Sequence, residues 1–257
     1  MKYAEELSFI KKTIEGIIKK YGNQRPDSVQ QKTEFDLVTE IDLSIEQDII
    51  RAITEEYPSD NFVSEEFNSQ NSLAGRCWII DPIDGTCNFS NGIPLYGIQC
   101  ALAVDEVIVM SYIYLNHLNE EYYAILGEGA YMNGKRIELP QDRPINHAIM
   151  SIGDFSHSNQ ALAKLQYGFL EKMYPRVAKI RMFGAACIDF SYAACGKTDG
   201  CVILTNNIWD IAPGILLCKE SGCIVTNIKG GEHHFSDNGV LVASTKGLHR
   251  LMVESFI

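Results

Sequence analysis

The sequence predicts a mixed α and β fold in which helical and strand layers are compactly joined. Two helical patterns precede the first strand, a strand-rich block follows, and helices then alternate with strands to the end. The hydrophobic fraction is 46% and the charged fraction 21%, as in ordinary globular proteins. We see no repeat, low-complexity segment or flexible linker, so we expect residues 1–257 to form a single domain.

In the N-terminal part, apolar residues at helical spacing predict two helices. One covers residues 4–21, and the other contains Ile41, Ile45, Ile49 and Ile53 and ends near Tyr57-Pro58. The remaining expectations are strands at 77–81, 95–104, 107–115 and 121–126, a turn at Asn133-Gly134, and a polar loop at 66–76.

In the C-terminal part, the pattern predicts alternating helices and strands. We expect helices at about 158–173, at 186–196, from about 210, and at the chain's end. The strands between them are expected at 178–183, 200–205, 223–228 and 239–244.

Charge and composition exclude several classes of protein. The formal charge of −11 argues against nonspecific nucleic-acid binding, which needs a basic surface. The apolar runs are too short to span a membrane, and the acidic N-terminal segment does not resemble a signal peptide. Eight cysteines without a CxxC pair fit a reducing cytoplasm and make a zinc site improbable.

The segment WIIDPIDGTCNF (78–89) is the most informative in the chain. A buried strand ends in two carboxylates, Asp81 and Asp84, which is costly unless something neutralises them. Hard divalent cations bound through oxygen are the obvious candidates. The alternative is that both acids merely form a turn around Pro82.

Other acidic residues are candidates for the same site, and each has a structural alternative. Glu65 and Glu66 follow a short apolar piece, but adjacent acids are commonly solvated. Asp210 precedes an apolar helix and could be its N-cap. Asp42 could belong to a capping box with Thr39.

Gly85-Thr86 indicates phosphate chemistry. Glycine allows the backbone to approach a ligand, the following amides can face an anion, and the threonine hydroxyl could orient a water molecule. The six histidines form no ligand pattern, and His233-His234 are expected at the surface. Cys87 is expected to be a bystander.

With these residues in view, the chain resembles the inositol monophosphatase family of magnesium-dependent, lithium-sensitive phosphatases. The resemblance covers nearly the whole chain and rests on five segments in the family's order: KTEFDLVTEID (32–42), SEE (64–66), WIIDPIDGTCNF (78–89), FGAACIDFSYAACGKTDG (183–200) and WDIAPGILLCKESG (209–222).

The resemblance implies a five-layered αβαβα sandwich, often a homodimer, with a metal-binding half at about 1–145 and a substrate-side half at about 146–257. It implies two to three Mg²⁺ ions. The first would be held by Glu65, Asp81 and the carbonyl of Ile83, the second by Asp81, Asp84 and Asp210, and a third would share Glu65.

The resemblance also implies the catalytic roles. Asp42 and Thr86, with Glu65, would orient the attacking water, and Asp84 with the amides of Gly85 and Thr86 would hold the phosphate. Gly184, Ala185, Ala186 and Ile203 would line the pocket for the rest of the substrate. Lys32 matches a lysine in relatives but receives no role.

Two positions depart from the family pattern. Ser64 replaces a common glycine. Ile203 stands where enzymes acting on inositol phosphate usually have a glutamate that binds inositol hydroxyls, and isoleucine accepts no hydrogen bond.

The sequence therefore predicts a Mg²⁺-dependent phosphomonoesterase for inositol monophosphate or a similar small phosphate monoester. NADP 2′-phosphatase and fructose-1,6-bisphosphatase activities remain alternatives, as does hydrolysis of a 3′-phosphorylated nucleotide. A catalytically silent metal- or protein-binding module is the rival from another class.

Overall fold

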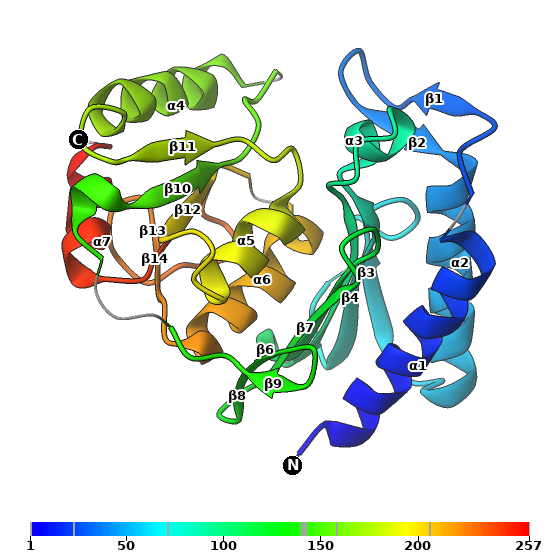
Figure 1. Ribbon diagram of the computed structural model, residues 1–257. Coiled ribbons are helices and arrows are strands. Elements are labelled where there is room, and N and C mark those ends of the chain that lie inside the picture. The colour runs from blue at the N-terminus through cyan, green and yellow to red at the C-terminus, as the bar shows by residue number, and fades with distance from the viewer. Residues whose placement is uncertain are drawn as a thin grey trace.

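Five layers of secondary structure alternate across the molecule, as the family resemblance predicts (Figure 1). The computed structural model describes residues 2–22, 24–70, 72–139, 143–157, 159–205 and 207–256. From one side of the molecule to the other, the layers are two helices, a seven-stranded sheet, two central helices, a five-stranded sheet and two further helices. Within the described residues, no helix combines the length and apolar character that a membrane span needs.

The seven-stranded sheet runs in the order β3-β4-β5-β6-β7-β8-β9, and all neighbours are antiparallel except β3 and β4. Its strands are β3 (Asn61–Ser64), β4 (Arg76–Asp84), β5 (Gly97–Val104), β6 (Val107–Leu115), β7 (Glu120–Ile125), β8 (Gly129–Met132) and β9 (Lys135–Arg136).

The five-stranded sheet runs in the order β11-β10-β12-β14-β13. Its strands are β10 (Ile149–Ile152), β11 (Lys179–Arg181), β12 (Gly200–Ile203), β13 (Ile224–Asn227) and β14 (Val240–Ala243). The strands β11, β10 and β12 are parallel, whereas β14 is antiparallel to both of its neighbours.

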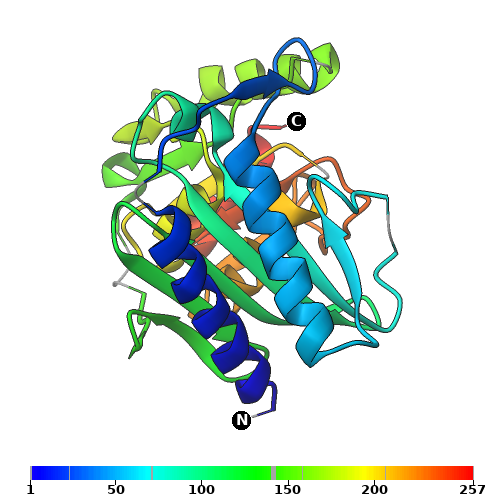
Figure 2. The same cartoon turned by 90° about the vertical axis from the view of Figure 1, so that its right-hand side faces the viewer.

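Helices α1 (Ala4–Tyr21) and α2 (Glu40–Glu56) lie side by side on the outer face of the seven-stranded sheet (Figure 2). The isoleucines that predicted them are buried against the aromatic and aliphatic residues of β4 to β6. Each helix therefore has one apolar face toward the sheet and a polar face toward water.

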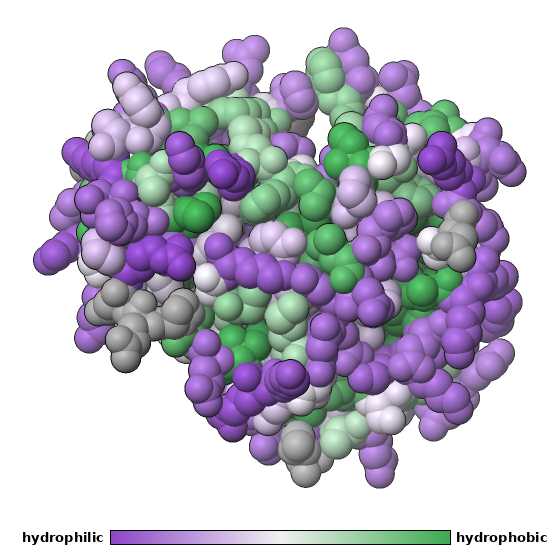
Figure 3. Space-filling model, in the orientation of Figure 1, coloured by the Kyte–Doolittle hydropathy of each residue, from purple (hydrophilic) through white to green (hydrophobic). Residues whose placement is uncertain are grey.

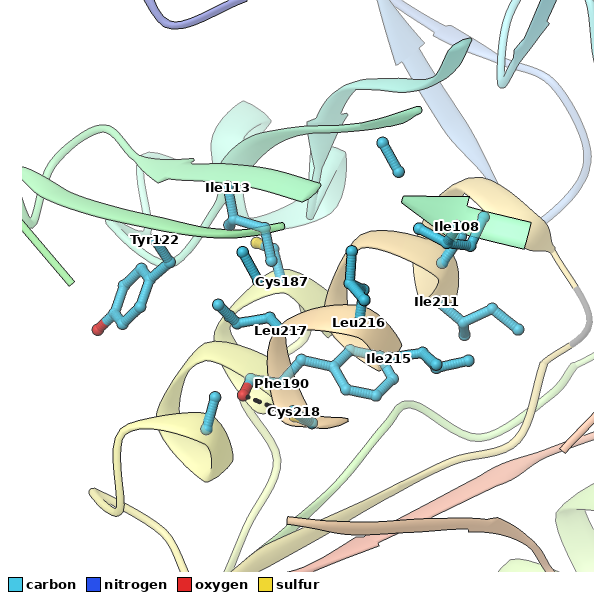
Figure 4. Close-up of a cluster of buried hydrophobic side chains, with 14 of the residues drawn as sticks. Ile108, Ile113, Tyr122, Cys187, Phe190, Ile211, Ile215, Leu216, Leu217 and Cys218 are labelled. Carbon is cyan, nitrogen blue, oxygen red and sulfur yellow. Dashed lines mark hydrogen bonds between the residues drawn. The ribbon is translucent and has the colours of Figure 1, made fainter. Parts of the chain in front are cut away.

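The central helices α5 (Ala186–Ala194) and α6 (Ile208–Ser221) lie between the two sheets and are apolar on nearly every side. Figure 4 shows Phe190 of α5 among Ile215, Leu216 and Leu217 of α6, with Ile113 of the large sheet nearby. The two helices approach closely at Gly214, where an added methyl group would overlap the Phe190 ring. This layer joins the cores of the two sheets.

Helices α4 (Gln160–Met173) and α7 (Lys246–Glu254) form the outermost layer beside the five-stranded sheet, where Phe169, Met173, Leu248 and Met252 are buried. A 3₁₀ turn, η1 (Ile145–His147), precedes β10, and a separate pair of short antiparallel strands, β1 (Val29–Gln31) and β2 (Leu37–Thr39), follows α1.

The predicted helices are present, although the helix expected from 210 begins at Ile208, and residue 158, the first of another, lies outside the described residues. The expected strands are also present: the one at 107–115 has the predicted bounds, and the others have shifted ends. The sequence interpretation missed β1, β2, β3, β8, β9 and β10, which have two to four residues each and are too short for a periodic pattern.

The close contact between α5 and α6 gives a test of the central layer. We expect Gly214→Ala to lower the free energy of unfolding by about 1–3 kcal/mol, because the methyl group overpacks the helix crossing. Gly16→Ala is the matched control: Gly16 is exposed within α1 with open space around it, so alanine should add about 0.5–1 kcal/mol. Urea unfolding measures both, and equal effects would contradict this packing.

Candidate active site

Strand β4 carries two aspartates at its C-terminal end, within the seven-stranded sheet. Its residues are buried from Cys77 through Ile83, and its pairing with β5 becomes irregular between Asp81 and Asp84. Gly85 follows with φ of +93° and begins the short helix α3 (Thr86–Ser90). A β-carbon there would lie 2.9 Å from that of Ala185, so glycine suits both the conformation and the close approach of the chain before α5.

Asp81 is the least compensated of these acids. It is 1% exposed, and among the described residues only Gln99 donates to it, with Nε2 3.4 Å from Oδ2. The other oxygen, Oδ1, is buried without a partner within the described residues. An isolated buried carboxylate is costly, so this site demands a counter-charge or a proton.

Asp84 and Asp210 approach from the sheet and from the central layer. The backbone amide of Cys187 donates to Asp84 Oδ2, and the Asn207 side chain donates to Asp210 Oδ2 at 3.2 Å. Asn207, not Asp210, is the N-cap of α6, so the simple capping interpretation of Asp210 is wrong.

Glu65 and Glu66 follow β3 and share a single lysine. Lys32 Nζ lies 2.7 Å from Glu65 Oε1 and 2.6 Å from Glu66 Oε1. The side chains are 18% and 5% exposed, so the interpretation of these acids as solvated charges is wrong. Lys32, which had no role in the sequence interpretation, is the cation of this group.

Asp42 serves two contacts at once. Its Oδ2 closes a capping box with Thr39 at the start of α2, as the sequence allowed. Its Oδ1 lies 3.0 Å from the Thr86 hydroxyl, which is also 3.0 Å from the carbonyl oxygen of Ile83. The cap and the site contact are therefore compatible, because each uses a different carboxylate oxygen.

Glu46 is a supporting residue that the sequence interpretation missed. It is fully buried on α2 and accepts from the Ser64 hydroxyl and from the amides of Glu66 and Phe67, each amide at 2.9 Å. These bonds fix the turn that carries Glu65, and Ser64, where relatives commonly have glycine, takes part. A glutamate beside Ile45 on the apolar face of α2 was the available signal.

One cleft of about 320 Å³ is lined by Glu65, Asp81, Asp84 and Asp210 and lies between the β1–β2 hairpin and the segment after β10. The cleft is visible as a notch in Figure 3. Its walls are formed by Phe35, Asp36, Leu37, Glu65, Asp81, Ile83, Asp84, Gly85, Thr86, Cys87, Asp154, Asn207 and Asp210. Asp42 reaches this cleft through Thr86. The predicted metal and phosphate residues thus come together.

A second hollow of about 180 Å³ adjoins the cleft, and the two share Asp84, Asp154 and Asp210. Its other walls are Gly153, Gly184, Ala185, Ala186, Asp189, Ile203, Leu204 and Thr205. The four residues predicted to line a substrate pocket therefore lie together beside the phosphate residues. Asp154, which lines both spaces, had no signal in the sequence.

Burial and mutual repulsion disfavour the ionised form of these acids. Burial raises the pKa of Asp42 to about 6 and that of Asp84 to about 6, although hydrogen bonds oppose both shifts. Burial and then the neighbouring carboxylates raise the pKa of Asp81 and Asp210 well above the usual range. Burial, followed by Glu65, raises the pKa of Glu66 to about 7.

The donor set fits a hard divalent cation. Carboxylates and the Ile83 carbonyl are oxygen ligands, and the buried Asp81 Oδ1 has no protein partner in the described ranges. As they stand, no three His, Cys, Asp or Glu side chains in those ranges converge tightly enough to hold an ion. Ion binding would therefore require the carboxylates to draw together.

The histidine and cysteine expectations are only partly met. His233 is buried, 9% exposed, and burial lowers its pKa, so the expectation that it lies at the surface is wrong; His234 is exposed. Six of the eight cysteines are buried. Cys87 is exposed and lines the cleft beside Thr86.

Comparison with known proteins places this geometry in a family. The model of the inositol monophosphatase family matches residues 3–256. A Thermotoga maritima protein named fructose-1,6-bisphosphatase/inositol-1-monophosphatase is 35% identical over 216 residues, 83% of this chain and 81% of that protein. The Nus factor SuhB of Pasteurella multocida is 32% identical over 229 residues, 87% of this chain and 84% of its own.

Solved structures share the fold. The Thermotoga maritima IMPase superposes with a TM-score of 0.86 at 30% identity, covering 98% of this chain and 96% of that one. An IMPase/NADP phosphatase crystallised with NADP and Ca²⁺ gives 0.81 at 24% identity, covering 97% and 92%. The chain therefore belongs to the inositol monophosphatase family and is a phosphoric monoester hydrolase.

Proposed function

We propose that this protein is a Mg²⁺-dependent phosphomonoesterase that hydrolyses inositol monophosphate or a similar small phosphate monoester with an activated water molecule. The observation that carries the proposal is the Asp81 carboxylate, which is buried beside Asp84, Asp210 and Glu65 with one oxygen that has no partner among the described residues. Such a cluster becomes favourable when cations bind, and the cleft then accepts a phosphate despite the acidic protein.

Two to three Mg²⁺ ions would be held by the chain's oxygen ligands. Glu65, Asp81 and the Ile83 carbonyl would bind the first, and Asp81, Asp84 and Asp210 the second. A third at Glu65 would compete with the Lys32 ammonium group. The bound ions would supply an acidified water and stabilise the departing oxygen.

The protein's own groups would orient the reactants. The Thr86 hydroxyl, which contacts Asp42 and the Ile83 carbonyl, would hold the attacking water, and ionised Asp42 would accept the proton that this water releases. The amides of Gly85 and Thr86 would face the phosphate. The leaving group would occupy the hollow lined by Gly184, Ala185, Ala186 and Ile203.

The hollow's size suits a small polyol, which favours inositol phosphate. One observation favours a second candidate: Ile203, 4% exposed, contributes an apolar wall where a hydroxyl-binding carboxylate would be useful. That wall is compatible with NADP 2′-phosphatase activity. Fructose 1,6-bisphosphate is suggested by the names of relatives such as the Thermotoga protein. Cytoplasmic location and homodimer formation remain predictions.

A panel assay tests the activity and ranks the substrates. Phosphate release with Mg²⁺ should be measured from inositol 1-phosphate, NADP, fructose 1,6-bisphosphate and adenosine 3′,5′-bisphosphate. We expect hydrolysis of at least one, with inositol phosphate first. Release from none would favour a catalytically silent module, and tenfold or greater preference for inositol phosphate would contradict the weight given to Ile203.

We expect Asp84→Asn to fold normally and lose activity by at least about 100-fold with Mg²⁺, because it removes a ligand charge at the centre of the site. Asp105→Asn is the matched control: Asp105 lies in an exposed turn with φ of +49°, which asparagine tolerates. Steady-state phosphate release and circular dichroism check both variants. Near-normal turnover by folded Asp84→Asn would contradict the proposed Mg²⁺-dependent phosphatase activity.

The raised pKa values predict how pH changes stability. Asp42 and Asp84 titrate near 6 when folded, above the ordinary aspartate value of 3.8, so the folded chain holds their protons more tightly than the unfolded chain. This contribution to the stability of the metal-free protein is full below pH 3.8, partly present at pH 5, and lost as pH rises through about 6. Mg²⁺ binds the ionised acids, so we expect it to raise Tm much more at pH 8 than at pH 5.

Differential scanning fluorimetry with EDTA or with Mg²⁺ measures this difference at each pH. Comparing the two conditions at one pH cancels titrations elsewhere in the protein. An equal Mg²⁺-induced change in Tm at pH 5 and pH 8 would show that these carboxylates do not bind the ion.

A further inference from the structure

The mouth of the cleft is bridged by one pair of aromatic rings. Phe35, at the tip between β1 and β2, stacks on His157, which follows β10; the centroids are 4.2 Å apart and the planes differ by 14°. Phe35 lines the cleft from one side, and Asp154, three residues before His157, lines it from the other. The stack therefore joins the two rims of the cleft.

The His157 side of the bridge is anchored. Phe155 stacks on Tyr167 of α4 with centroids 4.3 Å apart, and Gln166 of the same helix donates to the carbonyls of Gly153 and Asp154. Phe155 thus faces α4, whereas Asp154 faces the cleft and His157 faces its mouth. His157 is presented from a fixed wall.

The Phe35 side is held more lightly. Strand β1 is exposed along its length and pairs only with β2 within the described residues. The tip closes on itself through the amides of Lys32 and Thr33, which donate to the Asp36 carbonyl. Lys32 ties its base to Glu65 and Glu66, whereas the stack on His157 holds the tip.

Phe35 remains 60% exposed in this position. A large apolar ring at the rim of an acidic cleft contributes little to the core, and Phe35 lines the same cleft as Asp84, Gly85 and Thr86. Planar side chains in such positions are suited to stacking on nucleobases, because every base has an aromatic face.

We propose that Phe35 and His157 form a stacking subsite for the base of a nucleoside phosphate, with the phosphate held at Asp84 to Thr86. This inference rests on the proposed phosphatase activity and extends it to a substrate class. The Phe35 ring would move aside by about one ring thickness, and the base would take its place against His157 or lie between the two rings.

The connectivity of the substrate agrees with this arrangement. In an adenosine 2′-phosphate group the base is attached to the ribose carbon next to the esterified one, so the base projects beyond the sugar. The ribose would then lie beside Ile203 and Leu204, whose apolar side chains suit its ring carbons. A polyol phosphate has no planar group and would occupy the hollow without using the stack.

The test compares kcat/KM for adenosine 2′-phosphate and inositol 1-phosphate at one Mg²⁺ concentration. We expect Phe35→Ala to lower the ratio of the nucleotide value to the inositol value about tenfold, mainly through KM. Phe35→Trp, which keeps a stacking surface, should preserve the ratio, and His157→Ala should lower it. Tyr174→Ala, at an exposed aromatic residue outside the cleft, is the control and should leave both values unchanged.

Each other outcome decides against the subsite. If Phe35→Ala lowers both kcat/KM values alike, the stack is only a latch that shapes the cleft. No change in the ratio, or inositol phosphate as the sole substrate of the wild type, would also overturn the inference while leaving the phosphatase intact. Hydrolysis of neither compound by the wild type would instead count against the proposed function.

Discussion

Repulsion among buried carboxylates is the constraint around which the molecule is organised. The end of β4 and the helix α6 bring Asp81, Asp84 and Asp210 into one cleft with Glu65. Lys32 offsets the negative charge of Glu65 and Glu66 only. Repulsion of this kind lowers the stability of the folded protein. Bound multivalent cations offset the repulsion and allow a phosphate to bind.

The scaffold supplies the rigidity that this arrangement needs. Strand β4 is buried on both faces between α2 and α6, so the position where it ends is fixed from two sides. Helix α2 contributes Asp42 at its first turn, to hold Thr86, and Glu46 a turn later, to hold the loop of Glu65. The leaving group of the substrate would meet the second sheet, where Ile203 contributes an apolar wall unlike the carboxylates of the proposed metal site.

Much of this could be read from the sequence, since long periodic helices and the WIIDPIDGT segment have strong local signals. Strand β10 was missed because four residues carry no period, although it is an inner strand of its sheet. Lys32, Glu46 and the Phe35–His157 stack escaped because each depends on contacts between distant segments. His233 was misplaced because a polar loop sequence does not reveal that its ring is covered.

The proposed chemistry depends on divalent cations bound in the cleft by these carboxylates. The most direct test is anomalous diffraction from crystals soaked in Mn²⁺, an ion that takes the same oxygen ligands as Mg²⁺. We expect anomalous peaks in contact with Asp81 and with Glu65, Asp84 or Asp210, and carboxylates drawn toward the ions. A fully soaked crystal with anomalous peaks only elsewhere, and with Asp81 unmoved, would show that these carboxylates do not bind divalent cations.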